Sequence, residues 1–518
     1  MVRQGLLVCL LLCGLGSVWA QDAGESGMLK VARGRFELTA DEVAVVRRVG
    51  DELRSEDALP LLSIRADVVA FLCKNRDSLS VVPTRGLVFE NVVINGSLDL
   101  SFAKLAVPLS FSNCQFDRNA GRLSLRQGNF LSITFSHCSD LPGINARGLS
   151  VDHSLIFESQ CLGEIDLKNA DIGNDLYFEG AELKVSDAAV RSCIYARNAR
   201  ISGDVILDRA TANGRIDLQG VTIGGMFSAH DARFELAAEG TSSDKQVVLD
   251  LAGTTIGRDF DLDNTLVGGQ LKLADADVTK SVRLHRLSQG SRPSIDLAGL
   301  NCSRLSVDAT ARPLSGNLRL HGCVYSDIHI VDPGEPETET YLNWVRLSGP
   351  DQFSEQPYEF LAGVLKKQGK DDVARALLIA KVEDKPTRSL VDALVRQLAW
   401  MVGYGYSPLR AVWLALAVIL LGFVVFKGAY RRGLLVVKAN NAPVKLKTPN
   451  LTLLMYSVDV FVPLVDFGVG PAYVPGKVDT GMEAPEVTLF RIYYWFHVAA
   501  GWLICTVAVA GLTGLVRV

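Results

Sequence analysis

The residues in this chain that could do chemistry are aspartates that recur between two apolar residues, as in Ile216-Asp217-Leu218. Similar triplets surround Asp99, Asp166, Asp250, Asp261 and Asp296. A row of carboxylates can hold a sugar or a metal ion, and two at a suitable separation can act as acid and base on a glycosidic bond. For such an enzyme the first candidates are Asp166, Asp217, Tyr177 and Tyr195. We favour a structural interpretation, because a sequence repeat accounts for the spacing.

The repeat has a period of eleven residues. A small or β-branched residue returns in this register at Ala199, Ala210, Val221, Ala232, Thr254, Thr265 and Ala276. The triplets lie four positions upstream, and their alternation with period two is typical of short strands. We expect the glycines that often follow, such as Gly203 and Gly225, to form corners because glycine accepts positive φ. Two units, about 22 residues, then form one turn of a right-handed parallel β-helix over residues 87–330.

This turn length predicts which charges are neighbours. Asp250 is expected beside Lys272 and Asp261 beside Arg283, and each such pair contributes about 0.2 to 1 kcal/mol. The aspartates are therefore expected on the outside of the helix, without a catalytic role. The seven histidines show no ligand spacing and no Cys-x-x-Cys pair occurs, so we predict no metal, no cofactor and no catalytic set.

The first 20 residues have the pattern of a secretory signal peptide: Arg3, an apolar run from Leu6 to Leu15, and a small-residue end at Ala20. Export would place the cysteines in an oxidising compartment. Cys302 and Cys323 are 21 residues apart, close to one turn, which makes them a candidate disulfide. The alternative is that both are buried free thiols.

Helices are expected on both sides of the β-helix. Thr39 and Glu42 form a capping-box pattern, and with a second helical pattern at 64–74 they predict a helical cap over residues 28–86. Such a cap would cover the open first turn. After an acidic break at 332–339, residues 340–386 predict a helical hairpin and residues 387–406 an amphipathic helix at the membrane surface.

Two C-terminal segments have the composition of membrane spans. Residues 407–430 form an apolar run of spanning length, followed by a basic flank with no acidic residue before Asp459. Residues 491–518 are expected to form the second span. The signal peptide and the basic flank agree on topology: an inner-membrane protein with its β-helix in the periplasm and its loop 431–490 in the cytoplasm.

That loop contains a re-entrant-like segment, 451–466, in which Asp459 and Asp466 flank an apolar stretch too short to cross a bilayer. Carboxylates at such a depth are costly unless they are paired. They could form an ion or proton site, or a gate. The structural interpretation, which we favour, is that they pair with nearby arginines (Arg431, Arg432 or Arg491).

Several motifs suggest a family resemblance: Ile94-Asn-Gly-Ser-Leu-Asp-Leu100, Gln356-Pro-Tyr-Glu359, Val402-Gly-Tyr-Gly-Tyr-Ser-Pro408, Pro463-Leu-Val-Asp466 and Ala510-Gly-Leu-Thr-Gly514. Through them the chain resembles, over nearly its full length, a loosely defined bacterial family of membrane-anchored, pentapeptide-like β-helix proteins. The resemblance implies a β-helix, a helical hairpin and two spans. Some members are labelled membrane-associated oxidoreductases, but this sequence has no dinucleotide fingerprint, redox cysteine pair or haem motif.

Together these features predict a non-enzymatic scaffold or binding platform, anchored in the lipid bilayer, that binds an envelope protein or a glycan. A net charge of -4 gives no sign of a nucleic-acid partner. Two alternatives stay open: a polysaccharide-active β-helix enzyme, and a channel or signalling module gated by the β-helix.

Overall fold

The structure is a computed structural model. It describes residues 27–50, 60–75, 82–185, 192–236, 247–289, 294–308, 318–331, 336–349, 353–386, 389, 392–393, 396–397, 408–439, 442–462, 467–470, 472–478 and 485–512. The predicted signal peptide and most of the predicted amphipathic helix lie outside these residues. The chain forms two compact units, Met1–Val373 and Ala374–Val518, which we describe separately.

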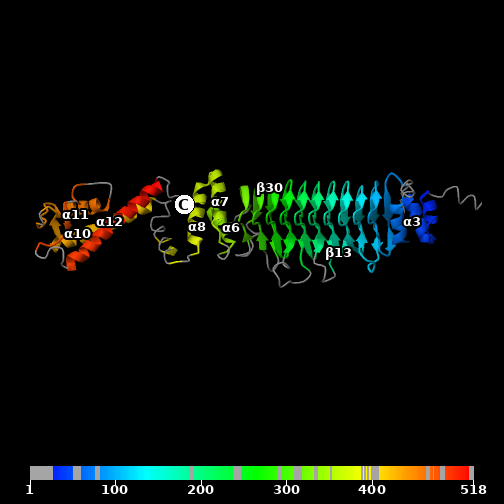
Figure 1. Ribbon diagram of the computed structural model, residues 1–518, viewed down its shortest axis with the longest axis horizontal. Helices are drawn as coiled ribbons and strands as arrows, with labels where there is room; N and C mark the ends of the chain where they lie inside the picture. The colour runs from blue at the N-terminus through cyan, green and yellow to red at the C-terminus, as the bar shows by residue number, and fades with distance from the viewer. Residues whose placement is uncertain are drawn as a thin grey trace, which may run out of the picture. The chain divides into compact units, whose positions relative to one another are not determined.

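The first unit is a parallel β-solenoid with helices at its N-terminal and C-terminal ends (Figure 1). One column of paired residues runs along it through Leu87, Leu109, Ile133, Leu155, Leu176, Val205, Phe227, Phe260, Val282, Leu305 and Ile328. This column confirms the predicted parallel β-helix architecture over nearly the predicted range. Val205 pairs with Phe227, 22 residues later, so the regular turn has the predicted length.

The strands of the solenoid fall into three sheets in the described part of the chain. The smallest contains β1 (Leu62–Arg65), β3 (Val92–Asn95) and β6 (Gln115–Phe116). The 18-stranded sheet contains β2 (Leu87–Glu90), β4 (Lys104–Leu105), β5 (Leu109–Ser112), β8 (Asn129–Phe130), β9 (Ile133–Ser136), β11 (Ser150–Val151), β12 (Leu155–Glu158), β14 (Asp171–Ile172), β15 (Leu176–Tyr177), β18 (Arg200–Ile201), β19 (Val205–Ile206), β22 (Thr222–Ile223), β23 (Phe227–Ser228), β26 (Thr255–Ile256), β27 (Phe260–Asp261), β30 (Asp277–Leu284), β33 (Asn301–Asp308) and β35 (Val324–Val331). The 14-stranded sheet contains β7 (Leu123–Ser124), β10 (Leu141–Asn145), β13 (Gln160–Asp166), β16 (Glu182–Leu183), β17 (Ser192–Tyr195), β20 (Thr211–Ala212), β21 (Arg215–Asp217), β24 (Arg233–Phe234), β25 (Val247–Asp250), β28 (Leu266–Val267), β29 (Gln270–Lys272), β31 (Ser288–Gln289), β32 (Ser294–Asp296) and β34 (Leu318–Arg319).

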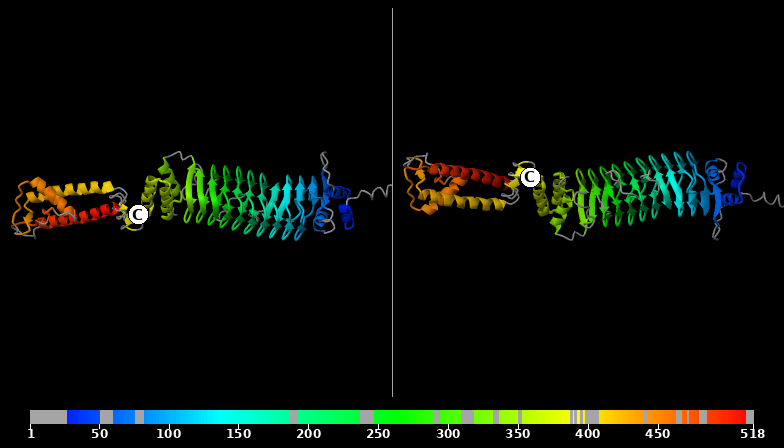
Figure 2. Two further views of the ribbon diagram at one scale, coloured as in Figure 1. Left: turned by 90° about the horizontal axis from the view of Figure 1, so that it is seen from above. Right: turned by 90° about the horizontal axis from the view of Figure 1, so that it is seen from below.

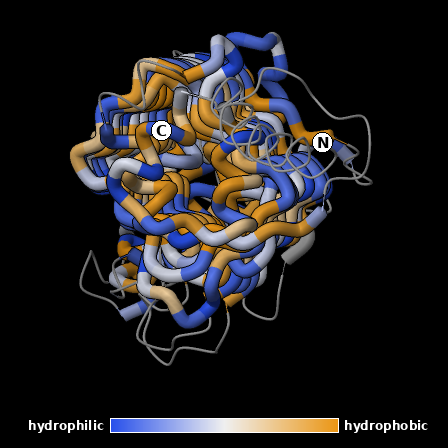
Figure 3. Tube along the Cα trace, turned by 90° about the vertical axis from the view of Figure 1, so that its right-hand side faces the viewer, coloured by the Kyte–Doolittle hydropathy of each residue, from blue (hydrophilic) through white to orange (hydrophobic). Residues whose placement is uncertain are grey.

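The small residues of the eleven-residue repeat lie inside the solenoid, where their exposed fractions are 0–2% (Ala199, Ala210, Val221, Ala232, Thr254, Thr265 and Ala276). Figure 3 shows apolar and polar stretches alternating along the coil. The two buried threonines satisfy their hydroxyl groups: Thr254 Oγ1 donates to the Leu218 carbonyl oxygen at 2.8 Å, and Thr265 Oγ1 donates to the Ala229 carbonyl oxygen. The repeat therefore selects small residues that fit inside each turn.

The prediction that Gly203 and Gly225 form left-handed corners is wrong. Positive φ occurs instead at the residue directly before each repeat residue (Asn198, Arg209, Gly220, Asp231, Gly253, Asn264 and Asp275). Gly225 is needed for a different reason, since a Cβ there would lie 2.7 Å from the carbonyl oxygen of Gly203 one turn below. The glycines after the repeat residue thus permit close stacking of turns.

The core of the N-terminal half is a stack of phenylalanine rings, one from each successive turn. Ring centroids are 5.3, 5.2, 5.3 and 5.1 Å apart along the series Phe89, Phe111, Phe135, Phe157 and Phe178. All five rings are almost completely buried. Apolar burial of this kind supplies most of the stabilisation of a turn, which has few local contacts of its own.

Three helices lie beside the first turns: α2 (Gly27–Arg33), α3 (Ala40–Gly50) and α4 (Ala66–Lys74) (Figure 2). The predicted capping box is confirmed, because the Thr39 amide donates to Glu42 Oε2 at 2.9 Å and the Glu42 amide donates to Thr39 Oγ1 at 3.3 Å. Glu42 also pairs with Arg65 at 2.7 Å. The second helix begins later than predicted, because Ile64 belongs to β1 and pairs with Ile94.

After the last strand come α6 (Glu337–Arg346), α7 (Gln356–Lys367) and α8 (Asp371–Asp384), the last of which lies mostly in the second unit. Helix α7 contacts β35, where the rings of Phe360 and Tyr325 meet edge to face at 5.1 Å. Burial raises the pKa of Tyr325 well above its usual value. The Gln356 side chain accepts from the Gly322 amide and donates to the Cys323 carbonyl oxygen, so α7 covers the last turn.

The described part of the second unit includes the helices α10 (Pro408–Arg431), α11 (Pro449–Phe461) and α12 (Pro485–Leu512), which contact one another, and a short hairpin of β36 (Leu435–Val437) and β37 (Tyr473–Pro475). Its core is built around Phe426, Tyr456 and Phe490. Among the described residues, one stretch has the length and hydropathy of a membrane span, Val412–Arg431, with a mean hydropathy of 2.3. It matches the first predicted span, 407–430, whereas no such stretch in the described part of 491–518 corresponds to the second.

Candidate functional sites

A cavity of about 650 Å³ lies at the C-terminal end of the solenoid. Its floor consists of side chains on β30, β33 and β35, and its remaining wall comes from the turn between α7 and α8. The lining residues are Ser281, Arg283, Arg304, Ser306, Asp327, Ile328, His329, Gln368 and Lys370. Cavities of about 300–1,000 Å³ are typical of small-molecule sites, so we take this one as the candidate binding site.

The parallel register explains why these side chains meet. Arg283, Ser306 and His329 occupy one column of paired positions, while Ser281, Arg304 and Asp327 occupy the column two residues earlier. Residues two apart on a strand face the same side, so both columns project from one face of the solenoid. The repeat therefore places five polar side chains and Asp327 on a single rigid floor.

Ion pairs hold the charged side chains of this floor. Arg283 contacts Asp261 at 2.9 Å and Asp259 at 3.3 Å. Arg304 Nε donates to Asp327 Oδ2 at 2.7 Å, and Gln368 Nε2 donates to the other oxygen of Asp327 at 2.7 Å. These contacts fix the guanidinium groups before any ligand is present, which lowers the entropic cost of binding.

The turn that forms the wall of the cavity is centred on Gly369, whose φ of +79° lies in the left-handed region that glycine tolerates best. Lys370 follows it, pairs with Glu337 at 2.7 Å and lies over the ring of Tyr341. Its pKa is raised, because hydrogen bonds and charge from Glu337 and Tyr341 outweigh the lowering effect of burial, which is the largest single contribution. Lys370 therefore keeps its positive charge beside the cavity.

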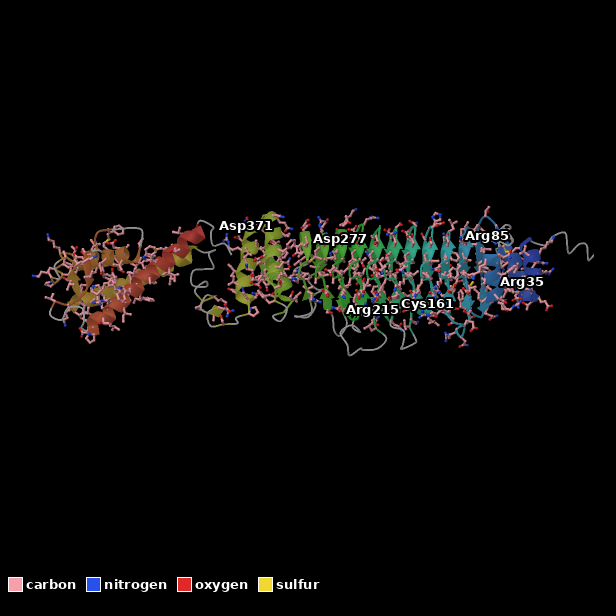
Figure 4. All side chains as sticks on the ribbon, in the orientation of Figure 1. Arg35, Arg85, Cys161, Arg215, Asp277 and Asp371 are labelled. Atoms are coloured by element: carbon pink, nitrogen blue, oxygen red, sulfur yellow. The ribbon has the colours of Figure 1, made fainter. Side chains whose placement is uncertain are left out.

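The repeated aspartates do not line the cavity, although Asp261 binds its Arg283, and they serve the corners of the coil. Asp166, Asp217, Asp250, Asp261 and Asp296 are only 1–2% exposed. Each accepts a hydrogen bond from the backbone amide two residues later, as in the 3.1 Å bond from Ala252 to Asp250. Each of the five also binds an arginine, such as Arg197 on Asp217 at 2.8 Å. Figure 4 shows Arg215, another of these arginines, on the solenoid.

The predicted charge neighbours agree with the register. Asp250 pairs with Lys272 and Asp261 with Arg283 in the strand ladder. The Asp261 and Arg283 side chains form the expected ion pair. Asp250 instead binds Arg215, which reaches it from the turn on its other side. The aspartate side chains were expected on the outside of the solenoid, but they are almost completely buried because neighbouring side chains cover them.

The four candidate residues for a polysaccharide-active site, Asp166, Asp217, Tyr177 and Tyr195, do not all lie on one sheet. Asp166, Tyr195 and Asp217 stand in one column of the 14-stranded sheet, whereas Tyr177 belongs to the 18-stranded sheet. Asp166 is bound by Arg147 at 2.5 Å and Asp217 by Arg197. Glu164, which sequence reasoning missed, lies near Asp166. Burial raises the pKa of Glu164, although it pairs with Arg122 at 3.3 Å.

The Cys302–Cys323 disulfide is not formed in the structure, where both residues are buried free thiols. The spacing of 21 residues is misleading, because the register pairs Cys302 with Tyr325 rather than with Cys323. Burial raises the pKa of the Cys302 thiol to about 12, and it raises that of Cys323 as well. Thiols that stay protonated react slowly. Both cysteines thus have the surroundings of small buried side chains, and their disulfide stays a prediction.

In the second unit, Asp459 holds a loop. Its carboxylate accepts hydrogen bonds from the backbone amides of Phe467, Val469 and Gly470 at 2.8, 2.9 and 2.5 Å. These bonds tie the end of α11 to the segment that follows it. Asp466 lies outside the described residues, so its role stays a prediction.

A buried polar cluster between α10, α11 and α12 was missed by sequence reasoning, which treated the histidines as scattered. Ser457 Oγ donates to the Ile419 carbonyl oxygen at 2.7 Å, and His497 Nε2 lies 3.1 Å from the Ser457 carbonyl oxygen. Gly422 makes room for them, since a Cβ there would lie 2.4 Å from both side chains. This contact among three helices could not be found from spacing along the chain.

Among the described residues, no group of three or more His, Cys, Asp or Glu side chains is placed to hold a metal ion. No protein-family model, curated protein or solved structure matches the chain.

Proposed function

We propose that the protein is a membrane-anchored binding platform, whose solenoid stands outside the cytoplasm and binds an envelope protein or a glycan without altering it. The observation that carries this proposal is the cavity over β30, β33 and β35. It joins polar side chains from three strands and a turn, while the repeated aspartates are already used in corners and ion pairs.

The anchor in this proposal consists of two spans, α10 and α12. Both expose large apolar side chains, among them Trp413, Leu420, Leu489, Trp495 and Trp502. Apolar surface of this extent is costly in water and favourable in lipid. Gly501 supports close packing of α12, because a Cβ there would lie 1.8 Å from the Phe461 carbonyl oxygen of α11.

The orientation follows from the sequence. A signal peptide at residues 1–20 would export the solenoid, and the basic flank after α10 would stay in the cytoplasm. In a bacterium this corresponds to the inner membrane with a periplasmic solenoid. We also propose that the coil is right-handed and that its repeat is pentapeptide-like.

A photo-crosslinking amino acid at Gln368 tests the platform in the full chain in its native membrane. Gln368 lines the cavity, whereas Thr222 is an exposed residue of the regular part of the solenoid and serves as the control position. We expect a discrete adduct from Gln368 and none from Thr222. Absence of an adduct from every cavity position, in protein that is present at normal abundance, would overturn the proposal.

Glu164 supports a second candidate function, hydrolysis of a polysaccharide, because a carboxyl with a raised pKa is suited to act as a general acid. In this case Asp166 would be the second carboxylate. Purified full-length protein that cleaves a polysaccharide, and loses the activity in Glu164→Gln, would favour the enzyme. Unchanged polysaccharide would favour the platform.

A further inference from the structure

The chain from the end of α10 to β37 is rich in cations and poor in carboxylates. Its cationic residues are Lys427, Arg431, Arg432, Lys438, Lys445, Lys447 and Lys477. The carboxylates of the same stretch, 427–478, are Asp459 and Asp466, and the Asp459 carboxylate accepts from three backbone amides. In the described part of the chain, none of the seven cations has an ion-pair partner. Their charge is therefore not neutralised within the protein.

The fold brings two of the basic segments together at Tyr430, near the end of α10. The Tyr430 hydroxyl accepts a hydrogen bond from the Leu446 amide at 3.4 Å. Leu446 lies between Lys445 and Lys447, and Tyr430 directly precedes the two arginines. The two lysines and the two arginines therefore lie near one another although they are separated along the chain.

The β36–β37 hairpin brings two more cations to the same region. The Gly476 amide donates to the Leu434 carbonyl oxygen at 2.9 Å, which places the next residue, Lys477, close to the end of α10. On the other side of the hairpin, the Lys438 amide donates to the Ala472 carbonyl oxygen at 3.0 Å. The cluster is thus a product of the fold and not of one basic segment. We call these seven side chains the basic surface.

The basic surface is open to a partner and adjoins exposed apolar side chains. Five of its cations are exposed and the other two, Lys427 and Lys477, are partly exposed. Val424, Leu451 and Val478 are 63%, 62% and 53% exposed. Val424 lies three positions before Lys427 on α10, so the two side chains share a face of the helix. The lysine chain lies over the ring of Phe423 and keeps its charge at the end of the helix.

This combination of charge and apolar surface narrows the choice of partner. In a bilayer, phosphate groups lie in a plane directly beside the acyl chains, so adjoining cations and apolar side chains contact both layers at once. A nucleic acid or a soluble anion offers negative charge without an apolar layer. A bilayer lipid with a negative headgroup is the partner that matches both properties.

We infer that the basic surface binds the headgroups of anionic phospholipids. The lysines and arginines donate to the phosphate oxygens, and the apolar side chains beside them contact the acyl chains. The inference rests on the membrane anchoring in the proposed function and adds a lipid ligand for the second unit, separate from the cavity on the solenoid. A zwitterionic headgroup binds more weakly, because its own cation is repelled by the surface.

Native mass spectrometry of the full chain in detergent tests this inference. The probes are phosphatidylglycerol and phosphatidylcholine with the same acyl chains, and glycerol 3-phosphate as a soluble phosphate. We expect phosphatidylglycerol to bind at least about tenfold more tightly than either of the others, with an affinity that falls as salt rises. Equal binding of the two lipids, or binding of glycerol 3-phosphate as tight as that of phosphatidylglycerol, would overturn the inference.

A triple variant locates the lipid site: Arg432→Gln, Lys445→Gln and Lys447→Gln. It should weaken phosphatidylglycerol binding about tenfold or more and leave phosphatidylcholine binding unchanged. The matched control removes three exposed cations of the solenoid, by Lys104→Gln, Arg200→Gln and Lys280→Gln, and should keep the wild-type affinity. Equal losses in the two variants would contradict the site.

A second variant covers the case in which the triple variant does not fold. It combines Lys438→Gln with Lys477→Gln on the hairpin and should weaken phosphatidylglycerol binding about fivefold or more. An unchanged affinity in this variant would contradict the site as well.

Extraction of membranes with alkaline carbonate tests the anchor separately. If the chain stays in the membrane and phosphatidylglycerol binds no more tightly than phosphatidylcholine, the inference fails and the anchor stands. If carbonate releases the chain, the anchor fails, and the lipid preference of the purified chain decides the inference by itself.

Discussion

Removing one ring from the phenylalanine stack tests how the solenoid is stabilised. Phe135 lies between Phe111 and Phe157, with centroid distances of 5.2 and 5.3 Å, and is completely buried. Phe135→Ala deletes a ring that two neighbouring turns contact, and the stacked backbone above and below prevents the space from closing.

The expected cost is about 3–5 kcal/mol, the range for a buried phenylalanine replaced by alanine. The two lost ring contacts are part of this figure, each worth about 0.5–1.5 kcal/mol. Phe102→Ala is the matched control in the same region. Its ring is 63% exposed, so its replacement should change the free energy of unfolding by less than about 0.5 kcal/mol.

Hydrogen exchange of the full chain in nanodiscs measures both the size and the place of this loss. Because each turn of a solenoid contacts only its neighbours, protection should fall in β5, β9 and β12 and persist in β30. A loss below about 1 kcal/mol, or an equal loss along the whole solenoid, would refute the reasoning.

Three further predictions concern single residues. Gly225→Ala should destabilise the solenoid by about 1–3 kcal/mol, measured by hydrogen exchange, because the new Cβ clashes with the turn below. In Gly253→Ala the new Cβ meets open space, and the φ of +64° should cost only about 1 kcal/mol in the same measurement. Burial raises the pKa of Glu42, but the hydrogen bonds and charge of Arg65 outweigh burial, so the pKa lies below the usual 4.5. The hydrogen-exchange protection of α3 should therefore be full above pH 4.5 and should fall at lower pH. Asp459→Asn should reduce the amount of protein that accumulates in the membrane, measured by immunoblot, because it weakens three bonds to one loop.

Controls make these outcomes specific. Equal losses in the two glycine variants would remove the close-stacking explanation. Glu42→Gln should abolish the acid-dependent step in α3, and an unchanged step would assign it to another group. Glu486→Gln removes an exposed carboxylate in the same unit and should leave accumulation unchanged. Normal accumulation of Asp459→Asn with loss of a transport activity would instead favour an ion site.

The solenoid was predictable because the eleven-residue spacing determines both the local backbone conformation and which side chains are buried. It identified the buried small residues and the pairing of Asp261 with Arg283. The role of Gly225 was mistaken because it depends on the turn below, which is distant in sequence. Spacing close to one turn does not fix the register either, since Cys302 pairs with Tyr325 and not with Cys323, and the disulfide between the two cysteines stays a prediction.

The cavity was not predictable from the repeat. It arises where the last strands meet a turn of different sequence, and Gln368 and Asp327 come together only through packing of α7 on β35. The polar cluster at His497 is likewise a product of helix packing. The capping box was predicted correctly because all its contacts lie within four residues.

The position of the solenoid relative to the membrane can be measured directly with single cysteines and a membrane-impermeant maleimide in bacterial spheroplasts. Thr222→Cys reports on the solenoid and Lys445→Cys on the loop between α10 and α12, and both positions are exposed. The described native cysteines of the solenoid are buried and give little background. An extracytoplasmic platform predicts labelling at position 222 in intact spheroplasts and at position 445 only after lysis. Labelling of position 445 in intact spheroplasts, with position 222 protected until lysis, would contradict it.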